Sequence, residues 1–314
     1  IQDYVAAAMQ NNKGLLAASN RWQAAVEKAK QEGALSDPMI KYEREDSADY
    51  QVDTYGVSQD VPFFGKRDLQ SGMAEAAAEV GRHGFEMVRR KVVRDVKNAV
   101  LEYYYLGRRI GVTTENLKLL SGIEGSVRAR YETGRETQAL LLQVQVEIGK
   151  TENELRSLEN LRTPLSAKLC SLTGLKAGEP LPWPDGAATG KADATDDQLM
   201  ARLKEHNPEL RVMAAMVDEQ GAALRLARRS YLPDLELGYE HMVETMTGVT
   251  GDAERDSDRI MVSMNVPLWF SKNNAAVREG RRRHTAATAD KHQKLSDLEA
   301  DLQTALFNFH DAER

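Results

Sequence analysis

One short segment occurs twice in this sequence, and the repeat constrains the fold more than any other feature. Residues 57–67 read VSQDVPFFGKR, and residues 262–272 read VSMNVPLWFSK. Both copies have Val, Ser, Val and Pro at matching positions. Proline cannot donate a hydrogen bond to a sheet, and it disfavours helical conformation in the residue before it. Each copy therefore predicts a strand that ends and a helix that begins, and we expect two tandem halves.

The repeat extends beyond this segment and defines the predicted domains. The first structural repeat covers 1–175, and the second, truncated repeat covers 195–314. A linker at 176–194, rich in Pro, Gly and Ala, separates the two repeats. The aligned pairs are Asn12 with Asn207, Leu15 with Leu210, and Pro38 with Pro233.

Each half should begin with a helix and continue into a β-hairpin. Residues 3–35 are predicted to form one helix that stops near Gly33. Residues 39–61 and 234–266 each contain two strand-like runs around a polar centre, which predicts a hairpin. The longer centre of the second hairpin, 245–258, is rich in Gly, Thr and Asp and is expected to be a loop. One face of this hairpin is predicted to carry Leu235, Leu237, Tyr239 and Val243, with Ile260, Val262, Met264 and Val266 on the return strand.

Long helices should follow both hairpins. The helical period holds for about 65 residues from Lys66 onward. Gly134 and Thr137 then suit a helix C-terminus and an N-cap, so a second helix should run back antiparallel and complete a helical hairpin at 66–175. A further long helix is expected at 272–314. The first helix carries a coiled-coil seam with positions spaced alternately four and three apart: Val92, Val96, Ala99, Tyr103, Leu106, Ile110, Thr113, Leu117 and Leu120.

These elements define the predicted fold class, which is mainly α with a small β part. Long antiparallel coiled-coil helices and two β-hairpins are expected in a tandem duplication. Glycine weakens a helix interior by about 1 kcal/mol relative to alanine, and close approach of a neighbouring helix is the expected compensation. The glycines concerned are Gly72, Gly81, Gly84, Gly107, Gly111, Gly122 and Gly125.

The composition argues against an enzyme, a cofactor-binding protein and a nucleic-acid-binding protein. The net charge is −6, so a nucleic-acid partner has no electrostatic support. Cys170 is the only cysteine, which excludes an intramolecular disulfide and a cysteine-rich metal site. The histidines form no catalytic or metal-binding pattern, and residues 186–192 depart from a phosphate-binding loop and are interpreted as linker. Methionines at 213 and 216 and at 242 and 246 would suit Cu(I), but they are more typical of core filling.

The strands favour a role at a membrane. No run of about 18 apolar residues exists that would form a transmembrane helix. Strands of about ten residues match the length that crosses a bilayer when tilted, and only a closed barrel satisfies their backbone there. Four strands cannot close a barrel of useful diameter, so several chains must contribute. Glu43 and Arg44 are adjacent, and therefore they cannot both face a polar lumen.

The order of several motifs resembles the TolC-like outer-membrane efflux factors, over essentially the whole chain. The strand-to-helix segments QDVPFFGKR at 59–67 and VPLW at 266–269 match that family. So do LPDL at 232–235, before a strand, and the Arg-Tyr-x-x-Gly-x-x-Thr pattern at 130–137. Each motif alone is weak, but the duplication makes the series specific.

The resemblance implies an outer-membrane channel subunit of a tripartite efflux system, a passive conduit for exported small molecules or metal ions. Three protomers would give four strands each to one β-barrel in the bacterial outer membrane, and their helices would form a large periplasmic tunnel. The implied partners are a periplasmic adaptor protein, an inner-membrane pump and outer-membrane lipid. The second helical tip and the last helix are expected beyond Arg314, so this stretch alone should not build the full tunnel.

The resemblance also places two candidate sites. The first helical tip, the implied adaptor contact, contains Arg130, Tyr131, Gly134 and Thr137. The repeated segments would form the junction of barrel and tunnel, where aromatic side chains favour the membrane interface. The junction residues are Pro62, Phe63, Phe64, Pro267, Leu268 and Trp269.

Two other classes of protein remain as alternatives from the sequence. A periplasmic adaptor also carries a helical hairpin between β segments, but it lacks a duplicated strand-and-helix unit. A structural periplasmic coiled-coil protein without channel activity needs no strands near 39–61 and 234–266. Both strand regions and the duplication therefore favour the channel.

Overall fold

A computed structural model describes residues 1–314 apart from 48–49, 177–180, 185, 187–193 and 247–252. The described chain forms two compact units. The first unit contains 1–18 and 86–193, and the second unit contains 19–85 and 194–314. This division does not follow the sequence repeat, whose boundaries stay a prediction. Most of the expected linker lies outside the described residues.

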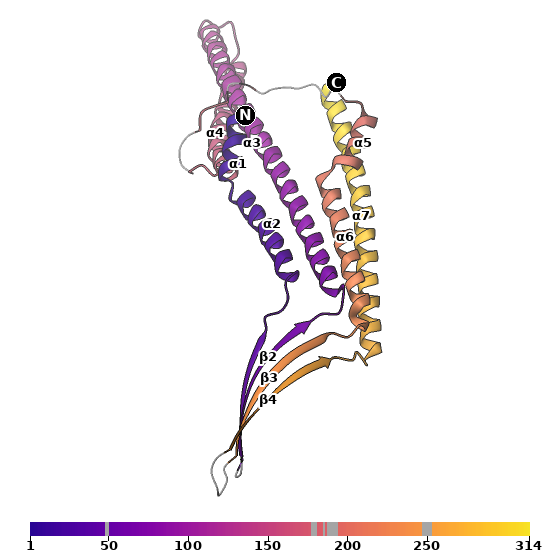
Figure 1. Ribbon diagram of the computed structural model, residues 1–314. Helices are drawn as coiled ribbons and strands as arrows, with labels where there is room; N and C mark the ends of the chain where they lie inside the picture. Colours follow the sequence, from indigo (N-terminus) through magenta and orange to yellow (C-terminus); the bar gives the residue numbers. More distant parts are fainter. Residues whose placement is uncertain (48–49, 177–180, 185, 187–193, 247–252) are drawn as a thin grey trace. The chain divides into compact units, whose positions relative to one another are not determined.

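The fold is mainly helical with one small sheet, as the sequence predicts (Figure 1). Within the described part of the chain, every helix is too short or too polar to span a bilayer. The helices are α1 (Gln2–Asn11), α2 (Lys13–Glu32), α3 (Lys66–Glu132), α4 (Gln138–Thr173), α5 (Asp196–His206), α6 (Pro208–Arg228) and α7 (Phe270–Glu313), with a short 3-10 helix η1 (Arg229–Tyr231). The strands are β1 (Met39–Asp46), β2 (Tyr50–Val61), β3 (Leu235–Met246) and β4 (Ala253–Met264).

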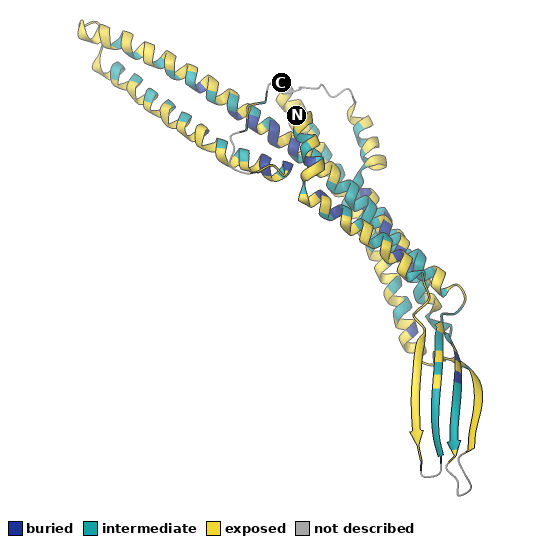
Figure 2. Ribbon diagram, turned by 60° about the vertical axis from the view of Figure 1, so that its left-hand side comes forward, coloured by how far each residue is buried: buried dark blue, intermediate teal, exposed yellow. Residues whose placement is uncertain are grey.

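The two predicted hairpins join into one antiparallel sheet of the second unit. The strand order is β1-β2-β3-β4, so the central pair, β2 and β3, connects the first hairpin to the second. Figure 2 shows the two outer strands exposed and the two central strands largely half-buried. The sheet therefore has two edges, β1 and β4, whose outer backbone groups have no partner strand in the described chain.

The expected loop at 245–258 is wrong, because both strands continue into it. Strand β3 extends to Met246 and β4 begins at Ala253, and these two residues are partners in the ladder. Polar residues such as Glu254 and Asp256 are included in β4. Backbone pairing along the ladder therefore outweighs the polar composition on which the loop prediction was based.

The single helix expected at 3–35 is also wrong, because Asn12 divides it. Asn12 has φ −66° and ψ 117°, and Asn207 has nearly the same values, φ −65° and ψ 125°. Each side-chain oxygen accepts a hydrogen bond from the backbone N–H three residues later, of Leu15 at 2.9 Å and of Leu210 at 3.3 Å. The repeated Asn-x-x-Leu pattern is thus a helix break followed by an N-cap, a position that asparagine favours.

The core of the first unit lies along the predicted seam of α3. Val96 and Tyr103 are fully buried, and they pack with Ala8 of α1 and Leu169 of α4. The hairpin of α3 and α4 forms as expected, and α4 ends at Gly174, whose φ is +72°. The heptad pattern therefore identified the core of this unit correctly.

Residues that follow α4 pack against this hairpin through the side chain of Trp183. Its ring stacks on Tyr103 with centroids 4.5 Å apart, and the guanidinium of Arg162 lies 4.6 Å from the ring centroid. The Tyr103 hydroxyl donates a hydrogen bond to the Leu181 carbonyl oxygen at 2.8 Å. A methyl group at Gly107 would lie 2.7 Å from the ring, so only glycine fits there.

Close packing explains few of the glycines in α3. Gly107 contacts Trp183, and Gly81 lies against Trp22, where a methyl group would be 3.4 Å from the Trp22 Cα. At the others a methyl group would meet no other part of the described chain within 4 Å, so the expected close approach is not made within the described chain. These are Gly72, Gly84, Gly111, Gly122 and Gly125.

Replacing Gly107 with alanine should destabilise the first unit, because the new methyl group would displace Trp183. Gly111 lies one turn further along α3 in open space, so Gly111→Ala should instead stabilise the helix by up to about 1 kcal/mol. Thermal unfolding followed by circular dichroism measures both effects. We expect a lower Tm for Gly107→Ala and a higher Tm for Gly111→Ala, and equal shifts would contradict this packing.

Candidate functional site

The two faces of the sheet differ in chemistry. Successive side chains of a strand point to opposite faces, and the register therefore assigns each residue to one face. The polar face carries charged side chains along its whole length, whereas the other, apolar face is hydrophobic next to the helices. Ile40, Ile260 and Val262 on the apolar face are 87%, 82% and 68% exposed. Gln59 is the one polar residue of this face next to the helices. The apolar and aromatic residues of the face are Ile40, Tyr42, Tyr55, Val57, Val61, Leu235, Leu237, Tyr239, Val243, Ile260, Val262 and Met264.

Farther from the helices, the apolar face ends in tyrosines that bind carboxylates. The Tyr42 hydroxyl donates to Asp53 and the Tyr239 hydroxyl donates to Asp258, each at 2.7 Å. Arg44 lies beyond Tyr42 on this face, 3.8 Å from Asp53. Because Glu43 points to the polar face, the adjacent residues Glu43 and Arg44 do point to opposite faces, as the sequence required.

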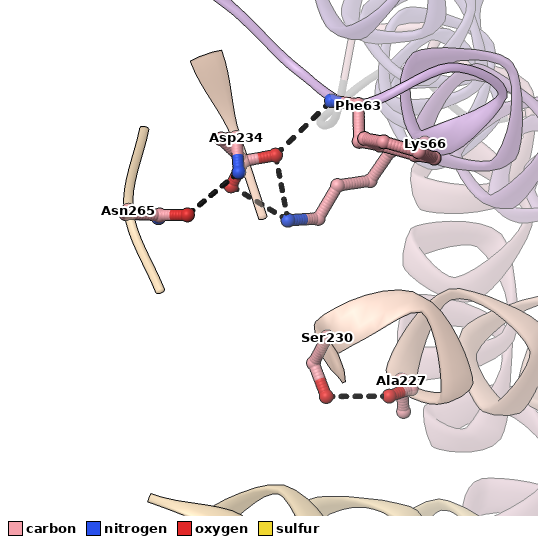
Figure 3. A network of polar contacts seen from close by, with 6 residues as sticks. All are labelled: Phe63, Lys66, Ala227, Ser230, Asp234 and Asn265. Atoms are coloured by element: carbon pink, nitrogen blue, oxygen red, sulfur yellow. Dashed lines mark hydrogen bonds and ion pairs between the residues drawn. The ribbon is translucent and has the colours of Figure 1, made fainter. Parts of the chain in front are cut away.

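Asp234 connects the sheet to the helices (Figure 3). Its carboxylate accepts hydrogen bonds from the Phe63 backbone N–H at 3.2 Å and from Lys66 Nζ at 2.7 and 2.8 Å. Its backbone N–H donates to Asn265 Oδ1 at 2.6 Å, and its carbonyl oxygen accepts from the Asn265 N–H at 3.1 Å. One residue before β3 therefore holds the start of α3 and the end of β4.

The start of this connection is fixed by η1 and the end of α6. Ser230 Oγ donates to the Ala227 carbonyl oxygen at 2.7 Å (Figure 3), which satisfies a carbonyl at the helix terminus. The chain then turns through Pro233 into Asp234 and β3. Sequence reasoning noted Asp234 only as part of the LPDL motif, and its position directly before a strand and after a proline was the available signal.

The ion pair shifts the acidity of Asp234. Burial by itself raises the pKa of this carboxyl, but the hydrogen bonds from Lys66 and from the Phe63 N–H favour the charged form, and the pKa is lowered from its ordinary value of 3.8. The Lys66 side chain is 17% exposed and the Asp234 side chain 36%. Asp234 is therefore ionised at neutral pH, and the pair is partly shielded from water.

Both copies of the repeated segment leave the sheet at one row. Val61 is opposite Leu235, and Leu235 is opposite Met264. Pro62 follows Val61 directly, and Pro267 comes three residues after Met264. The side chains that follow are exposed: Phe64 84%, Trp269 76%, Leu268 66% and Phe270 60%, whereas Phe63 is half-buried.

The second group of candidate residues lies in one tight turn between α3 and α4. Gly134 has φ +73°, and the N–H of Arg135 donates to the Arg130 carbonyl oxygen at 2.8 Å, which closes the helix end. Thr137 Oγ1 accepts from the Leu140 N–H at 3.4 Å and caps α4. Tyr131 is 39% exposed. The four predicted residues therefore share one turn, and their binding role stays a prediction.

A sheet with one apolar face that continues into long helices is the arrangement expected of an outer-membrane channel subunit. The family model described as outer membrane efflux protein matches residues 5–175 and 199–314. The chain therefore belongs to the outer membrane efflux protein family, as the sequence motifs predicted. No curated protein sequence matches the chain.

Solved structures agree with this fold. The outer membrane protein VceC from Vibrio cholerae matches with a TM-score of 0.81 and 16% identity, over 98% of this chain and 78% of VceC. A membrane protein from Pseudomonas aeruginosa matches with a TM-score of 0.77 and 18% identity, over 99% of this chain and 75% of that protein. CusC, whose crystal structures concern conformational changes that accompany folding and transmembrane channel formation, matches with a TM-score of 0.79 and 14% identity. The match covers 99% of this chain and 77% of CusC.

Family membership settles the class of function. The protein is an outer-membrane efflux channel of the TolC type with a periplasmic helical part, and such channels are trimeric. It is a transport protein and not an enzyme. The adaptor and the structural coiled-coil protein, which the sequence alone left open, are not supported.

Replacing Asp234 with asparagine should loosen the junction, because the ion pair with Lys66 is lost. After allowance for partial exposure, we expect a loss of about 1–2 kcal/mol, seen as a lower Tm in detergent. Asp60→Asn is the matched control, because Asp60 is an exposed carboxylate on neighbouring β2. A control that loses as much stability as Asp234→Asn would contradict the assigned role.

The effect of Asp234 should also depend on pH. Its pKa is lower in the folded chain than its ordinary value of 3.8, so its contribution is present above that value and is lost as pH falls through the folded pKa. The difference in Tm between wild type and Asp234→Asn should be constant from neutral pH to about pH 5 and shrink below about pH 4. A difference that persists unchanged to pH 2 would contradict the ion pair.

Proposed function

We propose that this chain is the outer-membrane subunit of a tripartite efflux system and acts as a passive conduit for small molecules or metal ions. The observation that carries the proposal is the sheet, which has one apolar face and two free edges. A sheet of this kind is stable in a bilayer only when its edges are paired, because unpaired backbone groups are costly there. The edges therefore require further copies of the chain.

Three copies would close the barrel through the outer strands. Strands β1 and β4 are the edges of the sheet, and β1 is exposed along its whole length. Pairing β4 of one copy with β1 of the next would leave no free edge. The apolar face would then contact lipid, and the polar face would line a water-filled lumen.

The repeated segments would mark the periplasmic side of the membrane. Phe64, Leu268 and Trp269 are exposed where the strands end, and such side chains are stable at the boundary of lipid and water. Pro62, directly after β2, and Pro267, three residues after the end of β4, would lie at that boundary. The helices below it would continue the conduit into the periplasm.

The tip between α3 and α4 would bind the periplasmic adaptor protein. Arg130, Tyr131, Gly134 and Thr137 support this assignment because they form one exposed turn. An inner-membrane pump would drive the transport, since a conduit without chemistry has no energy source of its own.

The test is export in a bacterial strain that lacks the corresponding channel. The complete subunit, expressed with its adaptor and pump, should lower the accumulation of a fluorescent pump substrate. The same subunit without the adaptor should have no effect. Export that needs neither adaptor nor pump would contradict a passive conduit in a tripartite system.

Removing an exposed tyrosine at the tip should weaken adaptor binding and thereby reduce export, whereas removing an exposed tyrosine elsewhere on α3 should not. Tyr131→Ala deletes a tip side chain, and Tyr105→Ala deletes another exposed tyrosine of α3 outside that turn. We expect at least several-fold weaker adaptor binding for Tyr131→Ala, as for the loss of an aromatic interface contact. Both variants should remain trimeric on native gels, and equal adaptor affinities would contradict the assigned contact.

A further inference from the structure

A row of charged side chains crosses the polar face of the sheet. In the register of the strands, Lys41 of β1 is opposite Gly56 of β2, Gly56 is opposite Glu240 of β3, and Glu240 is opposite Arg259 of β4. Glu240 carboxylate oxygens lie 3.6 Å from an Arg259 guanidinium nitrogen and 3.9 Å from Lys41 Nζ. We call Lys41, Glu240 and Arg259 the ion-pair row.

Within this row, the carboxylate of Glu240 is buried, whereas the two basic side chains are exposed. The Glu240 side chain is 8% exposed, whereas Lys41 and Arg259 are 58% and 56% exposed. The missing side chain of Gly56 makes room, because a methyl group there would be 3.3 Å from Glu240 Cγ and 3.4 Å from Lys41 Cβ. Glu240 thus lies over the backbone of β2, and the row presents cationic groups to the solvent.

The rest of the polar face has the opposite charge. Lys41 also contacts Glu43 on its own strand, while Arg259 has Glu240 as its one ion-pair partner among the described residues. Apart from the row, acidic residues outnumber basic ones on this face. They are Glu43, Glu45, Asp60, Glu236 and Glu244, against Arg255.

We propose that the ion-pair row determines ion selectivity in the barrel, with Arg259 as the main group that meets anions. The inference rests on the proposed function, in which the polar face lines the lumen of a trimer. Each subunit then adds one row at the same level, so a mainly acidic lumen contains a ring of Lys41 and Arg259 side chains at that level. Such a ring attracts anionic groups and opposes small cations. The ligand class is small anions, such as carboxylates of exported small molecules, and of the two proposed kinds of cargo the row favours small molecules over metal ions.

Charge substitutions in the complete trimeric subunit, reconstituted in planar bilayers, test the row. Glu240→Gln leaves Arg259 uncompensated and should lower the K⁺-to-Cl⁻ permeability ratio about two- to threefold, and Arg259→Gln should raise it by a similar factor. The double variant should return toward the wild-type ratio. Asp256→Asn is the control, because Asp256 lies on the opposite face of β4. The proposed role of the row would be overturned if the permeability ratio shifted no more than in the control. It would also be overturned if both single variants shifted the ratio in the same direction.

A second measurement separates this inference from the proposed channel. In lipid vesicles, the Arg259→Cys variant should react with a water-soluble maleimide, whereas Val262→Cys, on the apolar face, should not. The native Cys170 is buried. If neither variant reacts, or if only Val262→Cys reacts, the row does not line the lumen and the inference is overturned. Equal reaction at both would contradict the barrel itself and the row with it.

Discussion

The hydrogen bonds of Asp234 fix where the strands of the sheet end and where α3 begins. Within the second unit, one carboxylate holds the first residues after β2 and the ammonium of Lys66 at the start of α3. The backbone of the same residue holds Asn265 after β4. Strands from both halves of the duplicated sequence therefore end at one row, where Val61 and Met264 both face Leu235 across the ladder.

The sheet is informative because its two faces and its edges impose different requirements. The apolar face needs lipid or another apolar surface, since Ile40 and Ile260 are more than four-fifths exposed. The edges need partner strands. The polar face needs water, and only a closed assembly meets the three requirements together. A symmetric trimer meets these three requirements with copies of one kind of chain. It also repeats each lumenal side chain three times at the same level.

Much of the fold was readable from the sequence, because periodicity and capping are local. The seam through Val96 and Tyr103 located the core, and Gly134 with Thr137 located the turn of the hairpin. What could not be read depends on contacts between distant residues. Asn12 breaks a pattern that remains helical on both sides, the strands around 245–258 form by pairing despite their polarity, and Glu240 is recessed only because Gly56 lies beside it on another strand.

In the proposed channel, both repeated segments leave the membrane at the same level. Spin labels at Phe64→Cys and Leu268→Cys in the trimer, reconstituted into lipid vesicles, would report their depth through collision with oxygen and a water-soluble nickel complex. We expect equal depths at the periplasmic boundary of the bilayer. Depths that differ by more than one helical turn, about 5.4 Å, would contradict it.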